Sequence, residues 1–221
     1  MKFTCVICDL DGTLADTLED IARSMNRALE HHGFPARRVE EYRDMVGGGI
    51  ARLARRALPD LAPDDPVAEQ VAAYAAQCYA QEPVVHSKPY PGILTLLGEL
   101  KRLKTALAVL SNKPDPITQL VVGKLFPPGS FNLVLGETPG FPRKPDPAST
   151  WDILMTLGTT PRETIFMGDS EIDMETARAA ECCPLGVCWG YRSRRVLEKA
   201  GAQRIIQRPE ELSALIRGTR I

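Results

Sequence analysis

Two carboxylates stand side by side near the start of the chain, where an apolar segment ends. Asp9 and Asp11 follow the run of residues 3–8, which has the apolar character of a buried strand. Residues i and i+2 of an extended chain face the same side, so the two carboxylates are presented together. Like charges this close raise each other's pKa unless a cation lies between them, and oxygen ligands suit a divalent metal. The pair therefore predicts a Mg2+ site, with a simple acidic turn as the alternative.

Further polar groups follow this pair and recur later in the chain. Gly12 permits a turn with free backbone N–H groups and Thr13 adds a hydroxyl, so together they could hold a phosphate. Three later segments place polar groups after predicted strands or at a turn. They are Ser111-Asn112 after the run 107–110, Lys144 held extended by Pro145, and Asp169 to Asp173 after the run 164–167.

In this order the four motifs resemble those of the haloacid dehalogenase superfamily of aspartyl-phosphate phosphatases. The resemblance implies that Asp9 is the nucleophile and that Asp11 is the general acid and base. It also implies that Lys144 neutralises charge on the phosphoryl group and on Asp9, with Lys113 as a rival for that role.

The resemblance extends to the ligands of the phosphate and of the metal. The implied phosphate-binding residues are Gly12, Thr13, Ser111, Asn112 and Lys144, with Ser111 and Asn112 at the N-terminal end of a helix. Mg2+ is the implied cofactor. Its implied ligands are Asp9, the backbone carbonyl of Asp11, Asp169, and Asp173 either directly or as an outer partner.

Strands and helices that could position these residues alternate along most of the chain. Strands are expected near 3–8, 105–110, 131–135, 163–167, 184–188 and 203–206, and helices near 92–103, 115–125, 147–158, 170–181, 193–200 and 209–217. This alternation predicts an α/β fold, a Rossmann-like parallel sheet with helices on both faces. Ligands of such sheets bind beyond the carboxyl ends of the strands.

Residues from about 17 to 85 have only helical patterns and form a predicted insert. We expect a catalytic core of residues 1–15 and 88–221 and a small α-helical cap of residues 16–87, which is mobile in the resembled family. Asp16-Thr17-Leu18-Glu19 is a capping-box pattern that should start the first cap helix. The prolines of residues 88–92 should stiffen the return crossing.

The cap sequence bears on the substrate. It has no lysine between Lys2 and Lys88, which disfavours the phosphonate hydrolases and sugar-phosphate mutases of the resembled superfamily, since both use cap lysines. The core motifs, the Trp189-Gly190-Tyr191 segment and a glycine and arginine cluster resemble phosphoglycolate phosphatases. The cluster comprises Gly47, Gly48, Gly49, Arg52 and Arg55, which are expected to grip a small carboxylate, or otherwise form a flexible turn and a solvated helix face.

Composition excludes several other classes. With 27 basic and 28 acidic residues the net charge is −1, so neither nucleic acid nor a membrane surface is expected as a partner. We expect a cytoplasmic monomer or homodimer with reduced cysteines. Cys5 and Cys8 would point to opposite faces of a strand, which disfavours a zinc site. The run Arg192, Arg194, Arg195 is expected to be a solvated face.

Together these features predict a Mg2+-dependent phosphatase that acts on a small phosphorylated metabolite, 2-phosphoglycolate, through an aspartyl-phosphate. A pyrophosphatase, a nucleotidase or a sugar-phosphate phosphatase with the same core chemistry is the alternative. A non-catalytic protein that binds a phosphate ligand is the alternative from another class.

Overall fold

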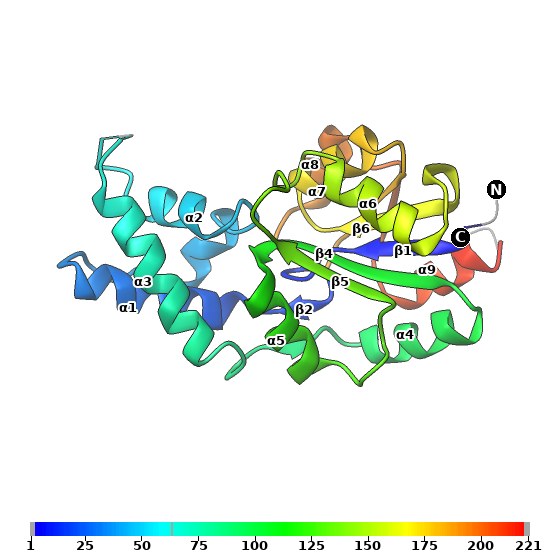
Figure 1. Cartoon of the computed structure of the whole chain (residues 1–221), viewed down its shortest axis with the longest axis horizontal. Helices are drawn as coiled ribbons and strands as arrows, with labels where there is room; N and C mark the ends of the chain where they lie inside the picture. Colours follow the sequence, from blue (N-terminus) through cyan, green and yellow to red (C-terminus); the bar gives the residue numbers. More distant parts are fainter. Residues whose placement is uncertain (1–2, 63, 219–221) are drawn as a thin grey trace.

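The computed structural model describes residues 3–62 and 64–218, and its centre is a parallel β-sheet of six strands (Figure 1). The strand order is β5-β4-β1-β6-β7-β8. The strands are β1 (Cys5–Cys8), β4 (Ala106–Pro114), β5 (Leu133–Glu137), β6 (Thr164–Gly168), β7 (Cys183–Val187) and β8 (Arg204–Ile206). The α/β fold class predicted from the sequence is thus confirmed.

Strand β1 is the middle of this sheet because it is apolar on both faces. All four of its residues are buried, as a strand covered on both sides requires. It pairs in parallel with β4 and β6, with Cys5 opposite Ala106 on one side and Thr164 on the other. This register brings the carboxyl ends of β1, β4 and β6 to the same edge of the sheet.

Helices cover both faces of the sheet. Helices α4 (Ile93–Arg102), α5 (Asp115–Leu125) and α9 (Glu210–Ile216) lie on one face, and α6 (Ala148–Leu157), α7 (Glu171–Ala179) and α8 (Arg194–Ala200) on the other (Figure 1). Cys8 packs in the apolar cluster of the first face, and Cys5 in the cluster that includes Ile153 of α6. The thiols of Cys5 and Cys8 therefore point to opposite faces, as the sequence predicts, and cannot share a metal.

A layer of helices extends from one end of the sheet (Figure 1). It is built by the segment between two short strands, β2 (Ala15–Asp16) and β3 (Lys88–Pro89), which pair antiparallel. Its elements are α1 (Leu18–His31), the 3-10 helix η1 (Val39–Asp44), α2 (Ile50–Ala57) and α3 (Val67–Gln81). They share an apolar core of their own that includes Met25, Leu29 and Tyr42.

Two polar side chains fix the start of α1. The helix begins at Leu18, but the capping box predicted over residues 16–19 does not form. The hydroxyl of Thr17 donates to Asp11 Oδ1 at 2.6 Å and makes no cap bond, while Asp16 Oδ1 accepts the Leu18 N–H at 3.5 Å. The carboxylate of Asp20 is 3% exposed and accepts backbone N–H groups of Val85, His86 and Ser87. It also accepts the Ser87 hydroxyl at 2.5 Å. Asp20 therefore connects the first turn of α1, where the chain has just left the sheet, to residues 85–87, where the chain returns to it.

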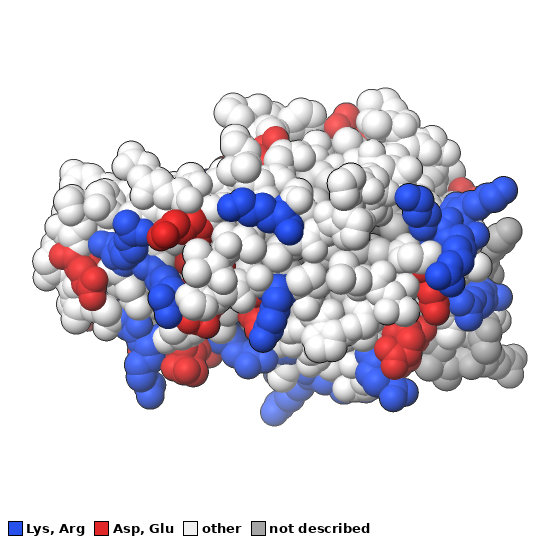
Figure 2. All heavy atoms as spheres, turned by 90° about the horizontal axis from the view of Figure 1, so that it is seen from below, with Lys and Arg blue, Asp and Glu red and all other residues white. Residues whose placement is uncertain are grey.

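The surface carries both signs of charge. On the face shown in Figure 2, lysine and arginine side chains lie in several separate groups, most of them near acidic side chains. None of the helices in the part of the chain that the structure describes is long and apolar enough to cross a membrane.

Candidate active site

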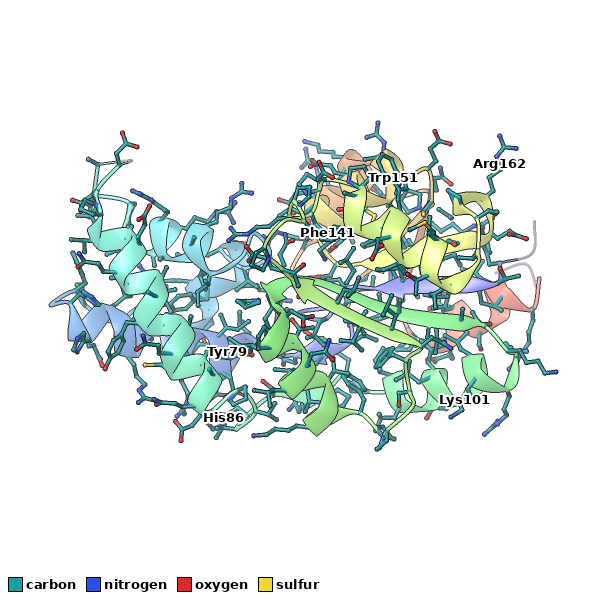
Figure 3. The ribbon with its side chains drawn as sticks, in the orientation of Figure 1. Tyr79, His86, Lys101, Phe141, Trp151 and Arg162 are labelled. Carbon is teal, nitrogen blue, oxygen red and sulfur yellow. The ribbon has the colours of Figure 1, made fainter. Side chains whose placement is uncertain are left out.

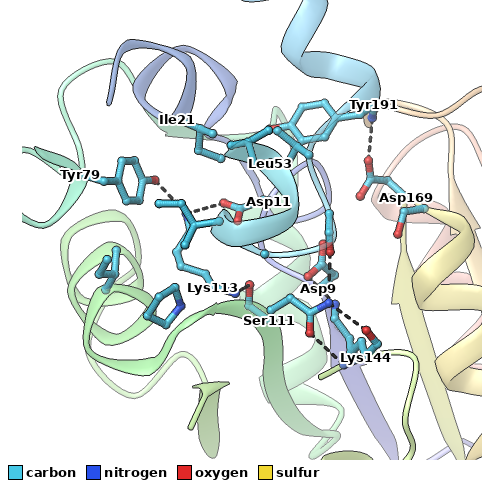
Figure 4. A pocket seen from close by; sticks show the side chains of 18 of the residues that line it. Asp9, Asp11, Ile21, Leu53, Tyr79, Ser111, Lys113, Lys144, Asp169 and Tyr191 are labelled. Carbon is cyan, nitrogen blue, oxygen red and sulfur yellow. Dashed lines mark hydrogen bonds and ion pairs between the residues drawn. The ribbon is translucent and has the colours of Figure 1, made fainter. Parts of the chain in front are cut away.

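Polar residues at the carboxyl ends of β1, β4 and β6 line one cavity, which residues of α1, α2 and α3 close from the opposite side (Figure 4). Asp9 directly follows β1 and Asp169 directly follows β6, while Ser111 lies within β4. The parallel register of these strands gathers residues that are more than a hundred positions apart. The sequence motifs therefore meet at one place, the edge where ligands of such sheets bind.

Lys144 is the centre of the charge network. Its ammonium lies 2.7 Å from Asp9 Oδ1 and 2.7 Å from Asp173 Oδ1, and its side chain is 3% exposed. Burial raises the pKa of the Asp9 carboxyl well above its usual range, against the opposing effect of Lys144. The carboxylates of Asp173, Asp169 and Asp11 raise that pKa further. Among the described residues, Asp9 Oδ2 has no hydrogen-bond partner, so this oxygen is free to meet a ligand.

Three carboxylates around Lys144 form a cluster that fits a divalent cation. Oxygen atoms of Asp9, Asp169 and Asp173 all lie within 4.8 Å of one another, and all three residues are buried. Burial, together with the charge of Asp173, raises the pKa of Asp169 to about 7. Several buried carboxylates with a single lysine between them leave negative charge without a partner, which an oxygen-bound divalent ion would neutralise.

The carboxylate oxygens of Asp173 have fewer free acceptor positions than those of Asp9 and Asp169. Its Oδ1 accepts from Lys144, and its Oδ2 accepts the Ser170 hydroxyl at 2.6 Å and the Ser170 backbone N–H at 3.1 Å. Ser170 and Asp173 form a capping box that starts α7. These bonds favour Asp173 as the outer partner of a metal ligand, since its oxygens already hold Lys144 and the helix end.

Asp11 is held by a different lysine. Its Oδ1 accepts from the Thr17 hydroxyl and, at 2.7 Å, from Lys113 Nζ. Lys113 Nζ also donates to the hydroxyl of Tyr79 at 2.8 Å (Figure 4). The two lysines that compete in the sequence therefore have separate partners: Lys144 contacts Asp9, and Lys113 contacts Asp11.

Gly12 and Thr13 both lie against the carboxylate of Asp169. Gly12 has φ +87°, and a Cβ there would lie 2.4 Å from Asp169 Oδ2, so only glycine fits. Its N–H donates to the carbonyl of Ala15 at 2.9 Å. The Thr13 hydroxyl donates to Asp169 Oδ1 at 3.2 Å, and neither residue lines the cavity. In the structure both residues contact or adjoin the carboxylate cluster, and their contact with a phosphate stays a prediction.

Ser111 and Asn112 line the cavity, but as residues of a strand. β4 continues to Pro114 and α5 begins at Asp115, so the predicted position at a helix N-terminus is wrong. The Asn112 side chain accepts the Lys144 N–H at 2.8 Å and donates to the Lys144 carbonyl at 3.1 Å. It also donates to the carbonyl of Gly47. Asn112 thus fixes the backbone that carries Lys144.

Only part of the predicted glycine and arginine cluster reaches the cavity. Gly47 and Gly49 line it, whereas Gly48, Arg52 and Arg55 do not. Arg55 donates to the carbonyl of Ala62 instead. The helical side of the cavity is mostly apolar, with Ile21, Met25, Val46, Ile50, Leu53 and Ala75.

The loop after β7 connects the helical layer to the sheet. Arg192 pairs with Glu171 at 3.1 Å and donates to the carbonyls of Asp44 and Val46, so its interpretation as a solvated residue is wrong. The Tyr191 N–H donates to Asp169 Oδ2 at 2.7 Å, and its ring lines the cavity. Neither contact, nor that of Tyr79, is signalled by a local sequence pattern, because each partner lies in a distant element.

Comparisons with known proteins agree with this arrangement. Residues 6–187 match the family model of haloacid dehalogenase-like hydrolases. A phosphoglycolate phosphatase of Pseudomonas putida is 32% identical over 217 residues, which are 96% of this chain and 78% of the relative. Another, of Chromobacterium violaceum, is 33% identical over 195 residues, 87% of this chain and 88% of the relative. A crystal structure from Lactobacillus delbrueckii subsp. bulgaricus, provisionally named a phosphoglycolate phosphatase, is 34% identical with a TM-score of 0.92, covering 98% of this chain and 99% of that one.

Proposed function

The chain belongs to the haloacid dehalogenase-like hydrolase family and is a phosphatase, and we propose that it hydrolyses 2-phosphoglycolate with Mg2+ through an aspartyl-phosphate. The observation that carries the proposal is the contact of Lys144 Nζ with Asp9 Oδ1 at 2.7 Å, beside two further buried carboxylates. A nucleophilic carboxylate, a cation that is charged at neutral pH and a metal-binding cluster are the parts that phosphoryl transfer requires.

The first half of the reaction transfers the phosphoryl group to Asp9. An oxygen of Asp9 forms a bond to phosphorus, and the bond from phosphorus to the alcohol oxygen breaks. Asp11, two residues along the chain, gives its proton to that leaving oxygen. Lys144 offsets the charge that collects on the phosphoryl oxygens, and Ser111 and Asn112 border the space in which those oxygens would lie.

The second half releases phosphate. Asp11 takes a proton from a water molecule, whose oxygen bonds to phosphorus as the bond to Asp9 breaks. Asp9, Asp169 and the backbone carbonyl of Asp11 would hold Mg2+, which would supply charge neutralisation and orient the phosphoryl group. Thr13 and Tyr191 hold Asp169 in place for that task through their hydrogen bonds to its two oxygens.

The helical layer is proposed as the cap, with residues 16–87 as the cap and residues 1–15 and 88–221 as the core. Support comes from the β2–β3 pair, at which the chain leaves the core and returns to it. The cap contributes one wall of the cavity, so its position decides whether water and substrate can enter.

Phosphate release tests the proposal. The purified protein with Mg2+ is offered 2-phosphoglycolate, pyrophosphate, nucleoside monophosphates and sugar phosphates, with Asp9→Asn as the blank. We expect preference for 2-phosphoglycolate and no turnover by Asp9→Asn. Substantial activity of the Asn variant would refute the nucleophile, and preference for another ester would replace the substrate while keeping the mechanism. No release from any ester, together with ligand-induced stabilisation, would favour a binding protein.

A further inference from the structure

The cap wall of the cavity has few polar groups with which to recognise a substrate. Apart from the glycine backbone, the cap residues that line the cavity are apolar except Ser24 and Tyr79. The Ser24 hydroxyl already donates to the carbonyl of Asp20 at 2.8 Å. No cap arginine lines the cavity within the described residues 3–62 and 64–218. A charged donor for an anionic group must therefore come from the other side of the cavity, where Lys113, Lys144 and Arg192 line it.

Lys113 and Tyr79 meet across the boundary between core and cap. Tyr79 lies on the side of α3 that faces the sheet (Figure 3), and its hydroxyl lies 2.8 Å from Lys113 Nζ. The Lys113 ammonium also lies 4.5 Å from the centre of the Tyr79 ring and 2.7 Å from Asp11 Oδ1. Both residues are buried, Lys113 at 8% exposure and Tyr79 at 4%, and both line the cavity.

Among the residues that the structure describes, Lys113 and Tyr79 each have a hydrogen-bond donor without an acceptor. An ammonium group has three N–H donors, and those of Lys113 that find acceptors go to Asp11 and Tyr79. The Tyr79 oxygen accepts from Lys113, so its own O–H donor remains available. For both the third N–H of Lys113 and the O–H of Tyr79, the described part of the chain supplies no acceptor. Two buried donors without acceptors, one of them cationic, are suited to an anionic oxygen.

We propose that Lys113 and Tyr79 bind the carboxylate of the substrate's leaving group and thereby select small phosphorylated acids. The inference rests on the proposed function. It assigns to Lys113 and Tyr79 the recognition of the carboxylate, which the sequence analysis expects of the glycine and arginine cluster. Lys144 contacts Asp9 and Lys113 contacts Asp11, and the Cα atoms of these aspartates are at most about 7 Å apart. Both lysines line the same cavity, so the proposal places the phosphoryl group of one molecule at the first lysine and its carboxylate at the second.

The surroundings favour an acid over a neutral ester. Ile21 and Met25 line the same cavity and offer no side-chain hydrogen bond, so a methyl group in place of the carboxylate would leave both donors unpaired. Sites built to pair a polar group discriminate strongly against an analogue that lacks it. The apolar wall also leaves a longer polar leaving group without partners.

Ethyl phosphate provides the matched probe, because it carries a methyl group where 2-phosphoglycolate carries its carboxylate. The readout is the ratio of kcat/KM for 2-phosphoglycolate to kcat/KM for ethyl phosphate, with saturating Mg2+. Tyr79→Phe removes one hydroxyl, and Lys113→Met removes the charge. The control is Tyr74→Phe, on the same helix but outside the cavity lining, where Tyr74 stacks on His31.

We expect the wild-type ratio to be high and to fall roughly tenfold or more in Tyr79→Phe and in Lys113→Met, while Tyr74→Phe keeps it. A wild-type preference that persists in both variants would overturn the inference and leave the proposed function intact. A wild-type ratio near one, with phosphate released from both esters, would overturn the inference and the proposed substrate but leave the phosphatase chemistry.

A binding measurement covers the case in which Lys113→Met abolishes turnover because Asp11 loses its partner. In the Asp9→Asn background, calorimetry gives the Kd of 2-phosphoglycolate with Tyr79 and with Tyr79→Phe. Weaker binding of roughly tenfold supports the inference, and an unchanged Kd with normal far-UV circular dichroism overturns it.

Discussion

Removal of the Asp20 carboxylate should destabilise the protein more than any other single change at the crossings between sheet and helical layer. Asp20 accepts three backbone N–H groups, of Val85, His86 and Ser87, and the Ser87 hydroxyl. A hydrogen bond to a charged group contributes about 1.5–3 kcal/mol when its loss leaves a buried donor unpaired. Val85 and His86 are exposed residues, so water can replace part of what Asp20→Ala removes.

We therefore expect Asp20→Ala to lower the free energy of unfolding by about 3 kcal/mol. Asp20→Asn keeps one oxygen for the donors but loses the charge, so we expect a loss of about 1–2 kcal/mol. Ser87→Ala removes one hydrogen bond and should cost about 1 kcal/mol. Urea unfolding followed by far-UV circular dichroism at pH 7 gives these values.

Asp60→Ala is the control: Asp60 is exposed, so the stability of this variant should stay within about 0.5 kcal/mol of wild type.

Burial alone would raise the pKa of Asp20, but the Ser87 hydroxyl and the backbone N–H groups outweigh this effect, and the pKa is lowered from 3.8. The stabilisation by the Asp20 carboxylate is therefore complete above pH 3.8 and is lost as the pH falls through the lower pKa that Asp20 has in the folded state. An Asp20→Ala variant as stable as Asp60→Ala at pH 7 would refute this reasoning.

Three further predictions concern the carboxylate cluster. Lys144→Met should lower kcat by roughly 10³ or more, since Asp9 loses its cation; steady-state kinetics with less than a tenfold loss would contradict this. The pKa of Asp169 is raised from 3.8 to about 7, so the metal-free protein should lose stability as the pH rises between these two values. Mg2+ should therefore raise Tm more at pH 8 than at pH 5, and equal Tm shifts at the two pH values in thermal scans would contradict this prediction. Gly12→Ala should cost about 1–3 kcal/mol in urea unfolding because of its positive φ and the nearby Asp169 carboxylate; a neutral result would remove that argument.

The sequence is sufficient to predict the framework of this site. Each predicted strand of the sheet and each helix beside it is present within a few residues, because continuous apolar runs and helical periodicity report burial directly. Asp9 and Asp169 follow strands that lie next to each other, and the parallel order of such strands is a general rule of α/β folds. The meeting of these motifs therefore follows from local patterns.

The partners that cross between elements could not be predicted in the same way. Thr17 looks like a helix cap, but its hydroxyl donates to Asp11. Arg192 looks exposed, but it donates to backbone carbonyls of the helical layer. Tyr79 is one of two tyrosines in an alanine-rich helix, and only the packing of α3 brings it to Lys113. These contacts depend on the relative placement of distant segments, and no periodicity in the sequence encodes that placement.

The β2–β3 pair has a consequence for how this enzyme can change over evolutionary time. Ala15 is paired with Pro89, so the long segment between them leaves and re-enters the sheet domain at neighbouring points. For the rest of the protein this segment is a closed loop, and each doubling of loop length costs only about 0.6 kcal/mol of closure entropy. Insertions, deletions or exchange of the segment between these two strands would leave Asp9 and the carboxylate cluster in register. Substrate preference can therefore diverge while the phosphoryl chemistry stays fixed.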